Sequence, residues 1–246
     1  MILFPVIHED AELLVLHKPA GLVCHPTKGD AYSSLISRVR LYLGGTDEPQ
    51  MVHRLDRETS GVMLFGKTRE ASQELRRLWE LGFVSKRYQA IVHGRVVATS
   101  GRIDLPLGRD DLSRVAIKDC VRSDGAFART RYRVERLFER PEGWFTLLWV
   151  WLDTGRKHQI RLHLAAVGHP IVGDKIYGGD EERYLAFVEG RLLPEQRLAL
   201  MTPNQALHAG SVWLPWNGEE RLFESPAEPW FLDFLGGGRV DWPERT

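Results

Sequence analysis

Residues 51–65 read MVHRLDRETSGVMLF, a polar segment between two apolar ones. The apolar pair Met51-Val52 precedes it and the run Val62 to Phe65 follows it. Short apolar runs bounded by polar or turn residues are typical of buried strands. A strongly polar connection between two core strands indicates a site that a rigid scaffold presents to a ligand.

Within this segment Asp56 is flanked by Arg54 and Arg57. Neighbouring cations favour an ionised carboxyl, so we expect the pKa of Asp56 to lie below its usual value. An ionised carboxylate beside a positioned cation can act as a nucleophile or a base. The alternative is a salt-bridged turn in which Thr59 and Ser60 cap the local backbone. The segment taken alone favours this structural interpretation.

The flanking segments predict the fold. Strands are expected at 13–16, 62–65, 88–92, 128–134, 145–152 and 206–214, and helices at 31–43 with Asp30 as its cap, at 69–81 and at 157–167. Strands outnumber helices and do not alternate with them regularly. We therefore expect an α+β fold with a mixed, mainly antiparallel sheet and flanking helices, rather than a doubly wound one. Residues 1–246 are expected to form one catalytic domain with a flexible tail from about Gly236.

Two further segments carry candidate functional side chains. Residues 154–161 read TGRKHQIR, and on the helix predicted at 157–167 His158 and Arg161 share a face. Arg161 would be a cation on a rigid element, suited to a carboxylate or phosphate, or else an ordinary surface arginine. Tyr88 follows Lys86-Arg87 at the opening of a strand, where a core aromatic with a satisfied hydroxyl is the alternative.

The charges are balanced overall but unevenly distributed. The chain has 33 basic and 33 acidic residues, yet residues 51–179 carry a net charge of +8, against −2 before them and −6 after them. Such asymmetry points to an anionic partner for the middle of the chain. Charge alone still favours a merely solvated surface. Neither a signal peptide nor a membrane span is evident, and two distant cysteines, Cys24 and Cys120, fit a reducing compartment, so a cytoplasmic protein is expected.

Several common catalytic signatures are absent from the sequence. It contains no phosphate-binding glycine loop, no dinucleotide fingerprint and no His-Glu-x-x-His pair. His158 and His163 are five residues apart, so on one helix they would diverge by about 140°. They would not converge on one ion from that helix. A cluster with His25, His53 or His208 stays open but has no support in the sequence, so structural histidines with satisfied hydrogen bonds, and no metal site, are expected.

Seven motifs together resemble those of the RluA-type pseudouridine synthases, in order and in spacing, over essentially the whole chain. They are HKPAG at 17–21, HRLDRETSG at 53–61, KRY at 86–88, PLGRD at 106–110, TGRKHQIR at 154–161, HPIVGDKIYG at 169–178 and LHA at 207–209.

The resemblance implies an isomerase that converts uridine to pseudouridine in structured RNA without cofactor or metal. By motif position Asp56 would be the catalytic aspartate, Arg161 would pair with it, and Tyr88 would stack on the target base. Arg54 would fill the gap that the flipped uridine leaves. His53, Arg57 and Leu207 are the remaining candidate substrate-binding residues, Leu207 in the uracil pocket.

The resemblance leaves the RNA open. A ribosomal or transfer RNA stem-loop is the expected partner, and the chain is expected to act as a monomer. Many relatives carry an N-terminal RNA-binding domain, whereas only 16 residues precede His17 here, so recognition is expected from the catalytic domain itself. Arg129, Arg131 and Arg133, on one face of a predicted strand, and Arg76, Arg77 and Arg109 are candidate phosphate contacts.

Two other functions remain open from the residues. One is an RNA-binding or folding factor that has lost catalysis, against which the joint presence of Asp56, Tyr88 and Arg161 argues. The other is a glycosidase, which lacks a convincing second carboxylate, although Glu58 is close in sequence.

Overall fold

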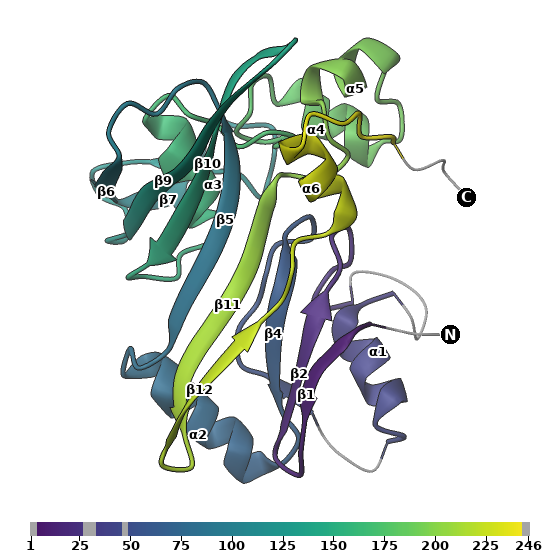
Figure 1. Cartoon of the computed structure of the whole chain (residues 1–246), viewed down its shortest axis with the longest axis vertical. Helices are drawn as coiled ribbons and strands as arrows, with labels where there is room; N and C mark the ends of the chain where they lie inside the picture. The colour runs from purple at the N-terminus through teal and green to yellow at the C-terminus, as the bar shows by residue number, and fades with distance from the viewer. Residues whose placement is uncertain (1–3, 27–32, 46–48, 243–246) are drawn as a thin grey trace. The chain divides into compact units, whose positions relative to one another are not determined.

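The computed structural model describes residues 4–26, 33–45 and 49–242, which fall into two compact units (Figure 1). The first unit comprises the described parts of Met1–Arg87 together with His208–Glu228. The second comprises Tyr88–Leu207 and the described part of Pro229–Thr246. The chain therefore passes between the units three times, and each unit is built from segments far apart in sequence.

The first unit contains a sheet in which β1 (Val6–Glu9), β2 (Leu13–Lys18), β4 (Ser60–Gly66) and β11 (Leu207–Trp216) lie in that order. The strand β12 (Glu219–Glu224) pairs with β11, and the short β3 (Gln50–Met51) pairs with β4. The pair β11–β4 is parallel, whereas β1–β2, β2–β4, β3–β4 and β11–β12 are antiparallel. Both candidate motifs at 53–61 and 207–209 thus lie at strand ends of one sheet.

Two helices belong to this unit, α1 (Leu35–Tyr42) and α2 (Arg69–Glu80). The side chain of Thr68 caps α2 by accepting a hydrogen bond from the backbone N–H of Ala71. The apolar side of α2 packs on the sheet in one core cluster, made of Leu13, Val15, Val62, Leu64, Ala71, Leu75, Leu78, Val212, Leu214, Trp216 and Phe223. Burial of this cluster fixes β4, and therefore the end of the polar segment that precedes it.

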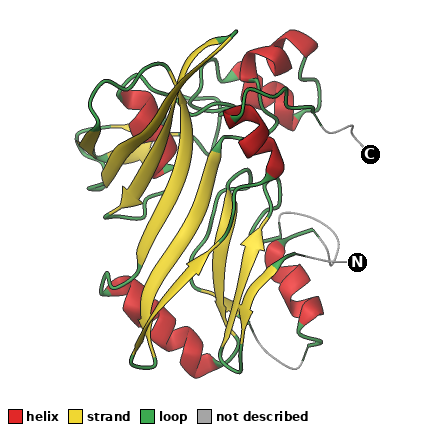
Figure 2. Cartoon of the chain, viewed as in Figure 1, coloured by secondary structure: helices red, strands yellow, loops and turns green. Residues whose placement is uncertain are grey.

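In the second unit the strands β5 (Ser85–His93), β10 (Gly143–Leu152), β9 (Arg129–Arg140) and β6 (Ser100–Asp104) are hydrogen-bonded neighbours in that order. The unit boundary falls within β5, after Arg87. A small second sheet pairs β7 (Leu107–Arg109) with β8 (Asp119–Val121). The helices are α3 (Gln159–Ala166), α4 (Glu182–Val188), α5 (Pro194–Leu200) and α6 (Pro229–Leu235), shown red in Figure 2.

The alternation predicted for β9 is present. Thr130 is fully buried and hydrogen-bonded to Gln159 and His163 of α3, whereas Arg131 and Arg133 are exposed. The helix α3 therefore covers the face of the sheet that carries Thr130, and the arginines project from the opposite face.

The predicted α+β fold with a mixed, mainly antiparallel sheet is confirmed. The prediction of helix 31–43 is wrong in its start, because α1 begins at Leu35 and Ser34 caps it by accepting from the N–H of Ser37; the predicted cap Asp30 lies outside the described residues. Helix 157–167 also begins later, at Gln159, because His158 adopts a left-handed backbone with φ +55°. The helices α4, α5 and α6 were not predicted. No helix in the described residues is long and apolar enough to cross a membrane.

Candidate active site

The polar segment between β3 and β4 is fastened to the first unit by a buried lysine. Lys18, at the end of β2, is completely buried and donates to the carbonyls of Pro19, Leu22 and Arg57 at 2.9, 2.8 and 3.0 Å. Burial lowers the pKa of Lys18 to about 8, although Asp56 is among the anionic groups that act against this shift. One ammonium therefore fixes both the turn at 19–22 and the turn that follows Asp56.

Further hydrogen bonds hold the same two turns together. The Arg57 Nε donates to the carbonyl of Gly21 at 3.1 Å, and the N–H of Gly21 donates back to the carbonyl of Arg57 at 2.9 Å. The buried thiol of Cys24 donates to the carbonyl of Leu55 at 3.3 Å. The residues on both sides of Asp56 are thus anchored through their backbone, while Arg54 stays exposed.

His53 supports the start of the segment. Its Nε2 accepts the backbone N–H of Leu64 at 3.1 Å, so the ring carries its proton on Nδ1. The ring stacks on Trp79 of α2 with centroids 4.6 Å apart and planes 15° apart. Burial, with a smaller contribution from the charge of Lys86, lowers the pKa of His53 to about 3. The imidazole is therefore neutral across the physiological range.

The end of the segment is held by a second neutral histidine. His208 Nε2 lies 2.9 Å from the carbonyl oxygen of Ser225 and must donate to it, so Nδ1 accepts from the Ser60 hydroxyl at 2.9 Å. Burial lowers the pKa of His208 to about 4. Next to this pair Gly61 has φ +122°, and a Cβ there would lie 2.2 Å from the carbonyl oxygen of Ala209. Glycine is required because β11 and β4 approach so closely.

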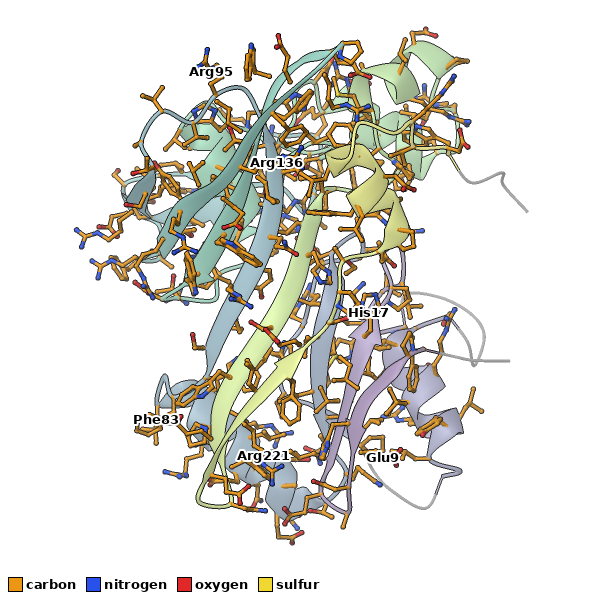
Figure 3. All side chains as sticks on the ribbon, in the orientation of Figure 1. Glu9, His17, Phe83, Arg95, Arg136 and Arg221 are labelled. Atoms are coloured by element: carbon orange, nitrogen blue, oxygen red, sulfur yellow. The ribbon has the colours of Figure 1, made fainter. Side chains whose placement is uncertain are left out.

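His17, labelled in Figure 3, extends this buried network. Its Nδ1 lies 2.6 Å from the hydroxyl of Ser225, and its ring centroid is 5.9 Å from that of His208. Glu228 accepts the N–H of Ala20 at 3.1 Å. The segment after β12 therefore ties the turn at 19–22 to the start of β11.

In the second unit Arg161 forms a buried ion pair with Asp174. The guanidinium Nε and Nη2 donate to the two carboxylate oxygens at 2.7 and 2.8 Å, and the side chains are 6% and 0% exposed. Asp174 also accepts the N–H groups of Ile176 and Tyr177. Burial opposes ionisation of Asp174, but the charge and hydrogen bonds of Arg161 outweigh it and lower the pKa.

Tyr177 connects this pair to the residue before α3. Its ring lies 5.1 Å from the guanidinium carbon of Arg161. Its hydroxyl oxygen accepts the N–H of Asp119 at 3.1 Å and lies 3.0 Å from Nδ1 of His158. Burial raises the pKa of Tyr177, so the hydroxyl stays protonated and donates to His158. This contact holds the ring of His158, whose φ is +55°, at the residue that precedes α3.

Tyr88 and Leu207 lie on neighbouring segments of the second unit, and both side chains are buried. The N–H of Ile91, on the strand of Tyr88, donates to the carbonyl of Ala206, one residue before Leu207, at 2.9 Å. The strand that carries Tyr88 is thereby fixed against the segment that carries Leu207.

Comparison with known proteins gives the family. The family model described as RNA pseudouridylate synthase matches residues 12–166. The chain belongs to the RNA pseudouridine synthases. This confirms the resemblance read from the sequence, and the family consists of isomerases that act on RNA.

Relatives in this family cover most of the chain. An uncharacterized RNA pseudouridine synthase of Aquifex aeolicus is 36% identical, covering 89% of this chain and 68% of its own. Ribosomal large subunit pseudouridine synthase D of Pseudomonas aeruginosa is 37% identical, covering 96% of this chain and 72% of its own. The structure of human RNA pseudouridylate synthase domain containing 4 superposes with a TM-score of 0.73 at 26% identity, covering 98% of this chain and 95% of its own.

The seven residues predicted for a pseudouridine synthase site divide between the units. The first unit holds His53, Arg54, Asp56 and Arg57 on one anchored segment. The second holds Tyr88, Arg161 and Leu207. His158 is not on a helix face with Arg161, so that part of the prediction is wrong. No group of three or more histidine, cysteine or acidic side chains in the described parts of the chain could hold a metal ion.

Sequence reasoning missed two residues that position this site, Lys18 and Asp174. Lys18 lies in the motif HKPAG and Asp174 in the motif HPIVGDKIYG, so the motifs were the feature of the sequence that could have indicated them. The arginines predicted to face phosphates are largely paired within the protein. The shortest guanidinium–carboxylate distances are 2.6 Å from Arg129 Nε to Asp104 Oδ1, 2.9 Å from Arg131 Nη2 to Asp153 Oδ1, and 2.7 Å from Arg77 Nε to Glu74 Oε2.

Proposed function

We propose that this chain isomerises uridine to pseudouridine in RNA and that Asp56 is its catalytic carboxylate. The observation that carries the proposal is the anchoring of the HRLD segment on both sides of Asp56 in a member of this family. A carboxylate held by fixed backbone contacts is pre-organised for chemistry at a glycosidic bond. Asp56 itself is only partly buried, so a substrate can reach it.

The environment of Asp56 supports its ionised state. The Lys18 ammonium lies near enough for the two charges to influence one another, and Arg54 and Arg57 flank the carboxylate in sequence. We propose that Arg161 keeps Asp56 ionised and oriented during turnover. The guanidinium of Arg161 is held on α3 by its two hydrogen bonds to Asp174, which fix the orientation of this cation.

We further propose that the target uridine is flipped out of its stack to reach Asp56. Arg54 is exposed at the start of the anchored segment, where its planar guanidinium can occupy the vacated position. His53 and Arg57 support this segment, and Tyr88 and Leu207 contact the flipped base. The reaction is an isomerisation, so the nucleotide keeps its mass and only the linkage between base and ribose changes.

Large-subunit ribosomal RNA is the substrate class to test first. Ribosomal large subunit pseudouridine synthase D from Pseudomonas aeruginosa carries that substrate in its name and aligns over 96% of this chain. A transfer RNA stem-loop is the second arm of the same experiment. We also propose that the protein acts in the cytoplasm and as a monomer.

The test is chemical mapping of pseudouridine in large-subunit ribosomal RNA and transfer RNA transcripts incubated with the protein. The wild type should modify a defined uridine, and Asp56→Asn should modify none while binding the RNA with similar affinity. Glu58→Gln, the same change two residues away, is the matched control and should stay active. Turnover by Asp56→Asn would overturn the catalytic assignment, and release of free uracil would support a glycosidase.

A further inference from the structure

Lys86 is a desolvated cation whose charge no acidic side chain of the described residues balances. It is the second residue of β5, just after the turn between α2 and β5 that Phe83 marks in Figure 3. Its side chain is partly buried, and burial lowers its pKa. The contact found for its ammonium is the ring of Trp79, with Nζ 5.8 Å from the centroid.

Other cations of the same unit are compensated. Lys18 donates to three carbonyls, and Lys67 lies 2.9 Å from Glu9 and donates to the carbonyl of Asp10 at 2.8 Å. Arg87, adjacent to Lys86, lies 2.9 Å from Glu224. Within the described part of the chain, Lys86 takes part in no ion pair or hydrogen bond of this kind. A partly desolvated ammonium without a counter-charge is unfavourable, and an anion from outside would relieve that cost.

The position of Lys86 links such an anion to the candidate site. Trp79, under the ammonium, stacks on His53, the first residue of the HRLD segment. The charge of Lys86 also helps to lower the pKa of His53. Because the imidazole is neutral, it carries no charge that would repel or attract the ammonium. An anion on Lys86 would therefore lie beside the start of the segment that carries Arg54 and Asp56.

We propose that Lys86 binds a backbone phosphate of the substrate RNA beside the HRLD segment. This inference rests on the proposed function, because phosphate is the anion that every RNA substrate carries. A lysine ammonium suits the task as a compact point charge that contacts phosphate without reading sequence. The ammonium itself lies over the Trp79 ring, a contact that places the charge but supplies no hydrogen-bond acceptor for its N–H groups.

The test is the salt dependence of binding to a fluorescein-labelled twelve-nucleotide oligouridylate, measured by anisotropy from 50 to 300 mM KCl. The logarithm of the association constant falls with the logarithm of the salt concentration, and loss of one phosphate contact on a single strand makes this slope less steep by about 0.7. If the two proteins bind equally at 1 M salt, a slope difference of about 0.7 makes the variant bind roughly fivefold more weakly at 0.1 M salt. Lys86→Met should show both changes, because methionine keeps an unbranched side chain of similar length and removes the charge.

Three comparisons make the result specific. Lys86→Arg should restore the wild-type slope, since it restores the cation. Lys67→Met, which removes the same net charge from a paired lysine, should leave the slope unchanged. An unaltered melting temperature for Lys86→Met separates loss of a contact from loss of the fold.

The outcomes distinguish this inference from the function it rests on. A wild-type slope in Lys86→Met, or an equal loss in Lys67→Met, would overturn the role of Lys86 alone. Failure of the wild-type protein to bind the oligouridylate at any salt concentration would overturn the role of Lys86 as a sequence-independent phosphate contact, while the mapping experiment alone decides the isomerase. Normal binding with no modified uridine in any RNA would overturn only the isomerase.

Discussion

Replacing Asp174 by asparagine should destabilise the protein far more than any surface substitution of the same kind. Asp174 Oδ2 accepts from Arg161 Nε at 2.7 Å, and Oδ1 accepts from Arg161 Nη2 at 2.8 Å and from the N–H groups of Ile176 and Tyr177. The asparagine oxygen can keep the contacts of Oδ1. Its amide NH₂ would then face Arg161 Nε, which is also a donor.

The magnitude follows from the burial of the pair. The substitution removes the charge of Asp174 from beside the Arg161 guanidinium, which is only 6% exposed. Removing one partner of a buried ion pair costs roughly 3–5 kcal/mol of unfolding free energy. In a chain of this size each kcal/mol corresponds to about 2–4 °C of melting temperature. We therefore expect Asp174→Asn to melt about 10 °C below the wild type at pH 7.

The assay is thermal unfolding followed by circular dichroism, with Asp153→Asn as the matched control. Asp153 pairs with Arg131 at 2.9 Å, but these side chains are 31% and 54% exposed. Exposed ion pairs contribute little, so the control should melt within about 2 °C of the wild type. A similarly small change for Asp174→Asn would refute the reasoning.

The pH dependence provides a second check on the same pair. The pKa of Asp174 is lower in the folded state than in the unfolded chain. Its stabilising contribution is therefore present above the ordinary carboxyl pKa, about 4, and is lost as pH falls through the folded value. The difference in melting temperature between the wild type and Asp174→Asn should stay constant from pH 7 to about pH 5 and should become smaller only in stronger acid.

Three further predictions concern the candidate site. Arg54→Ala should slow modification of a stacked uridine and be partly rescued by a substrate whose target is already unpaired; without rescue, Arg54 does not act in flipping. Arg161→Met should lose more turnover than Arg161→Lys, since lysine keeps the charge but not the planar fork, and the reverse order would contradict a charge role. The pKa values of His53, about 3, and His208, about 4, lie below the ordinary 6.5, so the unfolded chain binds the extra protons. Melting temperature should therefore fall as pH drops from 6.5 to 4, and less steeply in His208→Gln; equal slopes would show that His208 is not buried as a neutral ring.

Local sequence pattern predicted the elements whose limits are set locally. Helix α2 matches its prediction because Thr68 caps its start and Gly82, with φ +75°, follows its end. The alternation of arginine with Thr130 and its neighbours also reports directly which face of β9 is buried. The class of fold and the family followed from such segments.

Tertiary contacts set the limits that the pattern missed. The start of α3 is displaced because His158 adopts a left-handed backbone beside the Tyr177 hydroxyl, 19 residues away. The pairing of Arg161 with Asp174 joins a helix to a loop 13 residues later, and no periodicity in the sequence announces it. A motif names such residues but does not say which of them face each other.

The net charge of zero says little about RNA binding, because many charges are paired with a neighbour inside their own unit. Arg161 is compensated by Asp174, Lys18 by three carbonyls, and Arg129 and Arg131 by acidic side chains. What distinguishes a binding surface is a cation that the protein leaves without such a partner. Among the described residues Lys86 meets that description beside the anchored HRLD segment, although the sum of charges would not reveal it. The salt slope of a single lysine variant is therefore more informative about RNA recognition than any property of the whole chain.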